Sequence, residues 1–219
     1  MASAQANPAR ARGRFITFEG IDGAGKSTQA LRLAEALRAR GATVRLTREP
    51  GGSPGAEEIR RLLVEGPAER WSGETEVLLF TAARRDHLER TIRPALATGE
   101  VVISDRFADS TRVYQGAARG ELRKLVDRLH SDLIGLEPDL TFILDMDAGP
   151  ALARGLARRS GEDRFEDLGA GFQDRLRAGF RDLAREFPDR CRLIDAGRDV
   201  DVIAGEIAEI ALMDKARTI

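Results

Sequence analysis

Residues 18–28 read FEGIDGAGKST and contain the pattern G-x-x-x-x-G-K-[ST] directly after an apolar run. Glycines in such a turn let several backbone N–H groups point at one anion, and the start of the following helix adds its positive end. A lysine can then reach the β- and γ-phosphates of a nucleotide, and a hydroxyl can bind Mg²⁺. The competing interpretation is a glycine-rich turn whose lysine faces solvent. The residues of this predicted triphosphate-binding turn are Gly20, Ile21, Asp22, Gly23, Ala24, Gly25, Lys26, Ser27 and Thr28.

A second set of polar residues lies in the segment VVISDRFADSTRVYQGAARG (101–120). Asp105, at the end of an apolar run, could hold Mg²⁺ through water, and the planar fork of Arg106 could clamp a second phosphate. The alternative is a surface Asp–Arg pair that caps the next helix. Hydroxyl and amide groups then recur at near-helical spacing, which suits contact with a nucleotide base, although Tyr114 could serve packing instead. These groups belong to Ser110, Thr111, Tyr114 and Gln115.

Strand-like runs alternate with longer amphipathic segments along the chain. This alternation indicates an α/β fold of the P-loop NTPase type, with a five-stranded parallel sheet, helices on both faces and an arginine-bearing lid. The open alternation at 42–47 places that strand nearer an edge of the sheet. The strands are predicted at about 14–19, 42–47, 101–104, 140–145 and 192–195, and helices between 25 and 40, at 53–66, at 74–99 and near the C-terminus.

The bulk composition fits a globular protein. The 219 residues are 42 % hydrophobic and 32 % charged, and the net charge of −1 gives no basic field for nucleic acid. Cys191 is the single cysteine, so an intrachain disulfide is excluded, and its apolar surroundings indicate a buried, inert thiol. No apolar stretch is long enough to span a bilayer.

The domain organisation is expected to be simple. Residues 1–13 lack the apolar segment of a secretory signal and are expected to form a disordered tail, so the expected location is the cytoplasm. One domain is expected at 14–219. The glycine- and charge-rich segments 115–121 and 158–171 are expected to be mobile loops within it.

Triphosphate-binding turns of this type serve GTPases, motor ATPases, transporters and small-molecule kinases, so the turn does not name the phosphate acceptor. A GTPase would usually carry an N-K-x-D motif and an ATP-binding cassette an LSGGQ-like run, and the sequence has neither. Two classes stay open on the residues alone. One is a kinase for a small acceptor, and the other is a regulatory ATPase or switch that binds a macromolecule.

Several segments together resemble the bacterial thymidylate kinase family, whose members phosphorylate dTMP. The resemblance implies transfer of the γ-phosphate of ATP to dTMP with Mg²⁺, and a homodimer with neither nucleic acid nor membrane as partner. A sibling kinase with another monophosphate acceptor is the nearest alternative. The segments occur in the order of the family and read FEGIDGAGKST, TREPGG (47–52), FTAARRDH (80–87), DRFADSTRVYQGAARG (105–120), LDMD (144–147) and RRSGEDRFE (158–166).

The resemblance assigns the residues around the base of dTMP. Phe80 would stack on thymine, and Arg84 and Gln115 would hydrogen-bond its polar edge. Pro50 would help to wall the base pocket, with Glu49 nearby. Ser110 and Thr111 would also lie near the base. Taken singly, Phe80 could instead be a core residue and Arg84 a solvated helix charge.

The resemblance also assigns the phosphate and sugar contacts. Arg60 and Arg106 would hold the dTMP phosphate, although Arg60 alone could be a solvated helix charge. Asp22 would face the 3′-hydroxyl of the sugar or the metal shell. Tyr114 would crowd the 2′ position and disfavour ribonucleotides.

A polar segment, LARRSGEDRFEDLG (156–169), lies within the expected lid at about 154–170. A nucleotide kinase must keep water from bound ATP, and lid arginines would neutralise charge on the moving phosphoryl group. In the resembled family, members without an arginine in the phosphate-binding turn carry the catalytic arginine in the lid, and residues 22–24 contain none. The expected catalytic residues are Lys26, Asp105, Arg106 and Arg159, with Arg158 or Arg154 as substitutes for Arg159 and Arg164 in support.

Four further residues carry expectations that the fold can test. Phe107 stands where the resembled family usually has Tyr or His, which removes one polar contact. Arg112 stands where a small or neutral residue is commoner, and it is expected to point to solvent. A phosphate acceptor needs no strong general base, so His87 and His130 are expected on helix surfaces.

Overall fold

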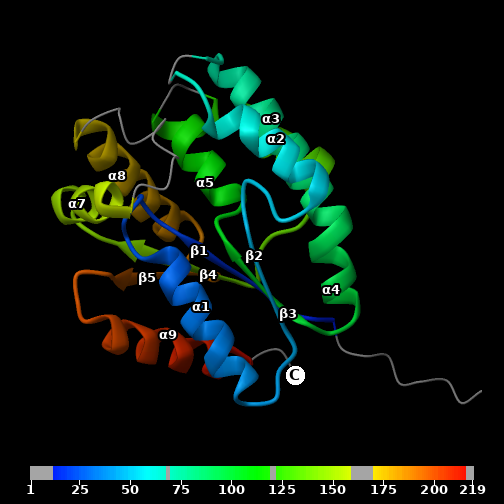
Figure 1. The fold of residues 1–219 in the computed structure, drawn as a ribbon, viewed down its shortest axis with the longest axis vertical. Helices are drawn as coiled ribbons and strands as arrows, with labels where there is room; N and C mark the ends of the chain where they lie inside the picture. The colour runs from blue at the N-terminus through cyan, green and yellow to red at the C-terminus, as the bar shows by residue number, and fades with distance from the viewer. Residues whose placement is uncertain (1–11, 68–69, 119–121, 159–169, 216–219) are drawn as a thin grey trace, which may run out of the picture.

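The computed structural model describes residues 12–67, 70–118, 122–158 and 170–215, in which a central sheet carries helices on both faces (Figure 1). The strands are β1 (Phe15–Glu19), β2 (Val44–Arg48), β3 (Val101–Asp105), β4 (Leu140–Asp145) and β5 (Cys191–Asp195). The α-helices are α1 (Lys26–Arg38), α2 (Pro54–Val64), α3 (Gly73–His87), α4 (Arg93–Ala97), α5 (Ala108–Val113), α6 (Arg123–Leu129), α7 (Ala148–Arg158), α8 (Ala170–Glu186) and α9 (Val200–Lys215). Three π-helical segments are η1 (Leu88–Ile92), η2 (Tyr114–Ala118) and η3 (His130–Ile134).

The sheet is parallel throughout and has the strand order β2-β3-β1-β4-β5. All five predicted strands are confirmed to within two residues, and β2 lies at an edge, as the open alternation of 42–47 indicates. Because the strands are parallel, their carboxyl ends meet at one edge of the sheet, which is where ligands bind in open α/β sheets. The segments that follow Glu19, Arg48 and Asp105 therefore lie close together.

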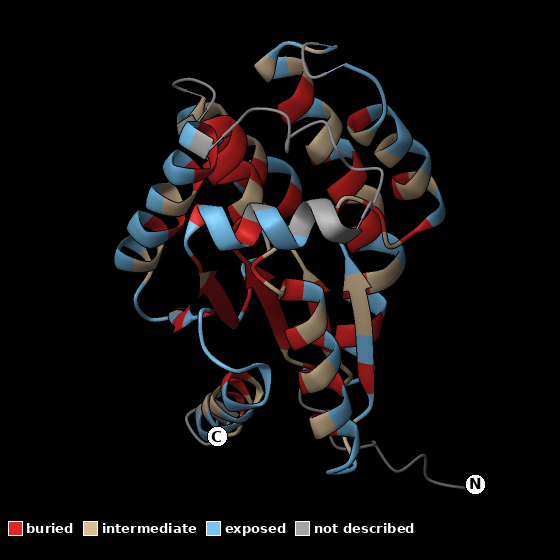
Figure 2. Ribbon diagram, turned by 60° about the vertical axis from the view of Figure 1, so that its left-hand side comes forward, coloured by how far each residue is buried: buried red, intermediate tan, exposed pale blue. Residues whose placement is uncertain are grey.

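Apolar side chains on the two faces of the sheet form two hydrophobic clusters. Alternate residues of a strand point to opposite faces, and accordingly Ile16 lies in the larger cluster and Phe15 in the smaller. The larger cluster includes apolar residues of α1, α8 and α9, and the smaller includes residues of η1, α4 and α5. Figure 2 shows the result, with buried strands at the centre and exposed outer faces on the helices.

The helix predicted at 74–99 is confirmed as one continuous run of α3, η1 and α4. Its π-helical turn lies just before Pro94, and the N–H of Arg93 donates to the carbonyl of Leu88, five residues earlier. Proline has no N–H and its ring crowds the preceding turn, so a local widening of the helix lets the chain continue past it.

The structure differs from the prediction at the end of the N-terminal tail and at the start of the loop predicted at 115–121. The backbone N–H of Gly13 donates to the carbonyl of Leu96 at 2.8 Å, so the packed chain starts no later than residue 13, within the segment expected to be a tail. Residues 115–118, expected in a mobile loop, form most of η2, because buried Tyr114 and Gln115 anchor the helix. The rest of that loop, at 119–121, and residues 159–169 lie outside the described residues. Among the helices of the described ranges, none has both the length and the apolar content to cross a bilayer.

Candidate active site

The turn between β1 and α1 closes around a space that an anion could fill. Gly20 and Gly23 have positive φ angles of 134° and 80°, a region of backbone conformation that other residues rarely adopt. A Cβ atom at Gly23 would lie 1.9 Å from the carbonyl oxygen of Ala151, and one at Gly20 would lie 2.6 Å from that of Leu144. Glycine is therefore required at both positions, and α1 begins at Lys26 with its free N–H groups at this turn.

Lys26 is buried at the base of the turn. Its Nζ donates to the carbonyl of Ile21 at 2.8 Å and lies 3.6 Å from Oδ1 of Asp22. Burial lowers the pKa of Lys26, and the neighbouring Arg106 lowers it further. Beside it, the hydroxyl of Ser27 donates to the Asp105 carboxylate at the end of β3.

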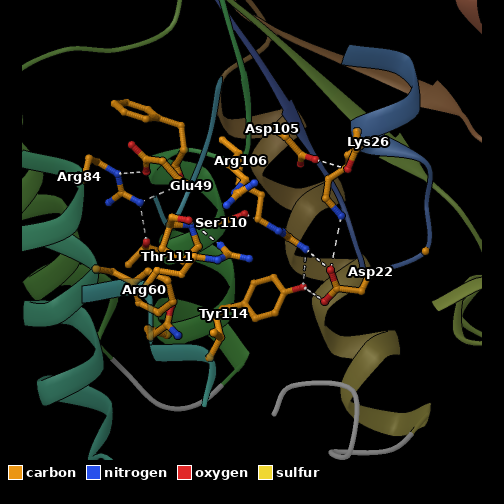
Figure 3. A pocket seen from close by; sticks show the side chains of 18 of the residues that line it. Asp22, Lys26, Glu49, Arg60, Arg84, Asp105, Arg106, Ser110, Thr111 and Tyr114 are labelled. Carbon is orange, nitrogen blue, oxygen red and sulfur yellow. Dashed lines mark hydrogen bonds and ion pairs between the residues drawn. The ribbon is translucent and has the colours of Figure 1, made fainter. Parts of the chain in front are cut away.

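Arg106 connects the turn to α5 and η2 (Figure 3). Its φ angle of 70° makes it the one described non-glycine residue with a positive φ, and such strain tends to occur at functional sites. Its Nη1 donates to Ser110 Oγ at 2.8 Å and to the carbonyl of Gly20 at 3.2 Å. Its Nη2 donates to Asp22 Oδ1 at 2.5 Å and to the hydroxyl of Tyr114 at 3.0 Å.

Asp22 is held as a carboxylate by these partners. Burial alone would raise the pKa of Asp22, but Arg106 and then Lys26 attract the carboxylate strongly enough to hold the pKa below its usual range. The hydroxyl of Tyr114 also donates to Oδ2 of Asp22 at 2.9 Å. Tyr114 therefore keeps its own proton, and burial is the largest cause that raises the pKa of its hydroxyl.

Glu19 lies beneath Arg106 at the end of β1 and is fully buried. One carboxylate oxygen accepts the backbone N–H of Phe107 at 2.8 Å, and the other accepts the hydroxyl of Ser110 at 2.6 Å. Burial, and next the negative charge of Asp109, raise the pKa of Glu19 to about 7, against the opposing charge of Arg106. Glu19 thus secures both ends of the turn that contains the strained residue Arg106.

Arg84 is the centre of a second, buried group of side chains. Its Nε donates to Glu49 Oε2 at 2.7 Å, and its Nη2 donates to Thr111 Oγ1 at 3.0 Å and to the carbonyl of Phe107 at 3.1 Å. Burial alone would raise the pKa of Glu49, but Arg84 and then His87 lower it below its usual value. The pair therefore stays ionised although both side chains are about 4 % exposed.

One cavity of about 330 Å³ joins these groups. Its wall begins at the phosphate-binding turn and ends at Phe80 and Gln115, on α3 and η2. The predicted site residues that line it are Asp22, Gly23, Gly25, Lys26, Ser27, Glu49, Pro50, Arg60, Phe80, Arg84, Asp105, Arg106, Ser110, Thr111, Tyr114 and Gln115. Phe107 also lines it, as do Arg48 and Val64, to which the sequence analysis gave no role.

Comparison with known proteins assigns the chain to a family. A family model described as thymidylate kinase matches residues 18–207. The chain belongs to the thymidylate kinase family. A thymidylate kinase of Jannaschia sp. (strain CCS1) is 70 % identical over 196 residues, which are 90 % of this chain and 94 % of that relative. One of Ruegeria pomeroyi is 65 % identical over 206 residues, which are 94 % of this chain and 98 % of that relative.

A solved structure agrees with these relatives. The crystal structure of thymidylate kinase from Ehrlichia chaffeensis matches with a TM-score of 0.75 at 37 % identity, and the match covers 92 % of this chain and 99 % of that chain. The family phosphorylates dTMP to dTDP with ATP as the phosphate donor, and this chain is an enzyme of that kind.

Other predicted site residues of this thymidylate kinase family member lie beside the cavity or outside the described residues. Gly20 and Ile21 offer their carbonyls to Arg106 and Lys26, Ala24 is buried, and Thr28 is half-buried in the first turn of α1. Arg154 lies on α7, where its Nη1 is 3.5 Å from the sulfur of Met146. Arg158 ends α7, but its side chain, like Arg159 and Arg164, lies outside the described part.

Three expectations about polar and charged residues are wrong. His87 is fully buried, and His130 is 7 % exposed, so neither is a helix-surface residue. Arg112 does not point to solvent, because its guanidinium lies within 3.0 Å of Asp109, Asp127 and Glu137 and is buried. His87 and Arg112 have partners more than ten residues away in the sequence, apart from the Arg112–Asp109 pair, and the partner of His130 is Glu137, beyond the end of η3. Periodicity within one helix could therefore not reveal the burial.

Cys191 and Phe107 are both buried apolar side chains in the structure. Cys191 is a buried free thiol, as expected, and burial raises its pKa to about 12, which makes it inert. Phe107 packs edge to face on Phe15 with ring centroids 4.9 Å apart, and the guanidinium of Arg84 lies 5.2 Å from its ring. The sequence analysis gave no role to Glu19. A carboxylate at the end of an otherwise apolar strand could have marked it as a functional residue.

Proposed function

We propose that dTMP binds in the cavity with its phosphate toward Arg106 and its base toward Phe80, and that ATP places its triphosphate in the turn of residues 20–27. The proposal is based on one observation. The same cavity is lined by the phosphate-binding turn and by the residues that are expected to surround the base. The two phosphates then meet beside Lys26 and Arg106, in the alignment that direct transfer requires.

Free hydrogen-bonding groups support a role for Arg84 and Gln115 in reading thymine. Within the described ranges, Arg84 uses Nε and Nη2 on protein partners and keeps Nη1, which could donate to a ring carbonyl. Gln115 donates from Nε2 to Glu76 at 3.2 Å, which turns its Oε1 away from that carboxylate and toward a ring N–H donor. A base with the opposite pattern would leave these buried groups unpaired, at a cost in binding.

The phosphate of dTMP would lie between Arg60 and Arg106. Arg60 already donates from Nη1 to the carbonyl of Pro50 at 2.5 Å, which fixes its direction in the cavity wall. The positive charges of both guanidinium groups would then face the phosphate oxygens. Asp22 and Tyr114, which bond to each other, would face the sugar and leave little room at its 2′ position.

The donor set beside the turn fits Mg²⁺. Ser27 and Asp105 contact each other and present two hard oxygen ligands, and Mg²⁺ typically takes one or two protein ligands with phosphates and waters completing the shell. In the described part of the chain, no group of three His, Cys, Asp or Glu side chains could hold a metal by itself. Mg²⁺ bound there would screen charge on the phosphate oxygens.

Catalysis would rest on alignment and charge neutralisation. The acceptor is a phosphate oxygen, which is ionised near neutral pH, so no strong general base is needed. Lys26 would contact the transferred group from the turn, and Arg106 would hold the acceptor oxygen in line. Arginines of the lid at about 154–170, with Arg159 as the first candidate, would complete the neutralisation and exclude water.

The proposal extends to assembly and location. Residues 14–219, together with Gly13, would form one domain. The domain would pair with a second copy through the α2–α3 face. Leu62 and Leu78 are exposed on these two packed helices, which suits a helix-to-helix contact between copies. The cytoplasm is the proposed location, since it supplies both nucleotides.

A substrate panel tests the proposed function. Purified protein with ATP and Mg²⁺ should convert dTMP faster than dUMP, dCMP, dGMP or the ribose form of TMP, with product measured by coupled ADP release and by chromatography. Preference for another monophosphate would reassign the acceptor. ATP hydrolysis that needs no acceptor and rises with a macromolecule would instead indicate a regulatory ATPase.

A further inference from the structure

His87 lies in a buried chain of polar contacts that leads from β2 to the cavity. Its Nε2 is 2.8 Å from the hydroxyl of Thr47, and its Nδ1 is 2.9 Å from Glu49 Oε1. The other oxygen of the same carboxylate accepts from Arg84 Nε at 2.7 Å. Arg84 in turn donates to Thr111 and so reaches α5. These side chains come from three segments that are distant in the sequence, namely the end of β2, α3 and α5.

The contact with Glu49 fixes the position of one proton on His87. Glu49 stays ionised beside Arg84 and can only accept, so Nδ1 of His87 must carry a proton. The two oxygens of Glu49 are then occupied by two different donors, His87 and Arg84. A carboxylate held at both oxygens has little freedom to rotate, and its Oε2 therefore fixes the position of Nε of Arg84, while Phe107 and Thr111 hold Nη2.

The space for the imidazole depends on a glycine in the TREPGG segment. A Cβ atom at Gly52 would lie 2.4 Å from His87 Nε2 and 2.5 Å from Thr47 Oγ1, and the φ angle of Gly52 is 84°. The carbonyl of Gly52 also accepts from Thr91 at 2.8 Å. The backbone of Gly52 therefore packs directly on His87, which contributes to the full burial of this histidine.

We propose that His87 is a positioning residue for the acceptor nucleotide. It does not line the cavity and cannot touch the substrate. It acts through Glu49, whose carboxylate it holds in the orientation that aims Nη1 of Arg84 at the base. The inference rests on the proposed function, in which Arg84 reads the polar edge of thymine.

Isosteric substitutions separate the Nδ1 contact from the burial of the ring. In His87→Asn the amide nitrogen occupies the place of Nδ1 and can still donate to Glu49. In His87→Leu the same branched shape lacks a donor, and in His87→Gln the amide reaches the place of Nε2 and serves Thr47 instead. The kinetic constants for dTMP and for ATP are measured for each variant, together with its melting temperature.

We expect the KM for dTMP to rise about tenfold in His87→Leu and His87→Gln and to change less than about twofold in His87→Asn. The turnover number and the KM for ATP should change less than about twofold in all three, because the donor side of the cavity is untouched. A merely structural role would instead make the effects follow the melting temperatures. Equal KM values for dTMP in Asn and Leu variants of similar stability would overturn the proposal.

Thr47→Val provides a second, independent measurement. It removes the partner of Nε2 and keeps the Nδ1 contact to Glu49, so the KM for dTMP should stay within about twofold of the native value. A tenfold rise there would overturn the proposal. Failure of the proposed function is distinguishable, since the native protein itself would then show no preference for dTMP in the substrate panel.

Discussion

On the donor side of the cavity, residues 20–27 form one uninterrupted segment, whereas the acceptor side combines Glu49, Arg84 and Thr111 from three separate segments. The donor side offers mainly backbone N–H groups and a single lysine at a helix start. The acceptor side depends on side chains that orient one another, with Arg84 bonded to a glutamate 35 residues away and to a threonine 27 residues away.

The difference shows what each ligand demands. A triphosphate carries the same charge pattern in every nucleotide, so a fixed turn of glycines with a helix start suffices to bind it. A single base must be distinguished from others of similar size, and this requires donors and acceptors in fixed positions. The acceptor side therefore needs partners such as His87 behind the side chains that contact the base.

The largest expected effect is on phosphoryl transfer itself and leaves the binding of both nucleotides nearly unchanged. Arg159→Ala should lower the turnover number about 10³-fold, the lower end of the range for an arginine that stabilises a phosphoryl transition state. The KM for dTMP should change little, because the proposed base contacts come from Phe80, Arg84 and Gln115. Steady-state kinetics test this, with Arg158→Ala as a matched control that should lose much less. If Arg159→Ala keeps the native turnover number, Arg159 is not the catalytic arginine.

Lys26→Met should disable the donor side alone. The methionine fills a similar buried volume but removes the charge at the transferred phosphate, so we expect the turnover number to fall about 10²-fold. Affinity for dTMP, measured by calorimetry without ATP, should stay close to native. A large loss of dTMP affinity would show that the two sides are not separable.

Phe80→Ala should disable the acceptor side alone. Aromatic stacking on a base contributes about 1–3 kcal/mol, so the KM for dTMP should rise about 10- to 100-fold while the KM for ATP stays unchanged. Phe80→Tyr keeps the ring and should remain near native. If the alanine variant binds dTMP normally, Phe80 is a packing residue after all.

Glu19 lies behind the turn that contains Arg106, and it accepts hydrogen bonds from Phe107 and Ser110. We expect its ionisation to make the free energy of unfolding depend modestly on pH. Burial raises the pKa of Glu19 to about 7, so its contribution to stability is full below the pKa of the unfolded chain and falls as pH rises toward 7. From about pH 5.5 to pH 7, the native protein should lose about 1.5 kcal/mol relative to Glu19→Gln. Urea unfolding of both proteins at the two pH values measures this difference. A constant difference would contradict the shifted pKa.

The features that could be predicted from the sequence depend on residues that are close to one another along the chain. The strands could be located from short apolar runs, and the helix at 74–99 could be recognised although Pro94 lies inside it. Gly20 and Gly23 could be placed because the turn needs their backbone freedom. His87 and Arg112 were misjudged because a polar or charged residue on a helix usually faces water, and their partners Glu49 and Glu137 lie on other segments.

The sequence by itself determined the phosphate-binding turn and the alternation of strands and helices, because both depend on residues that are neighbours along the chain. Only the tertiary structure decided which charges are buried, how Glu19 secures Arg106 and how His87 reaches Arg84 through Glu49. These contacts join residues that lie far apart in the sequence, and folding brings them together where the parallel strands end at one edge of the sheet.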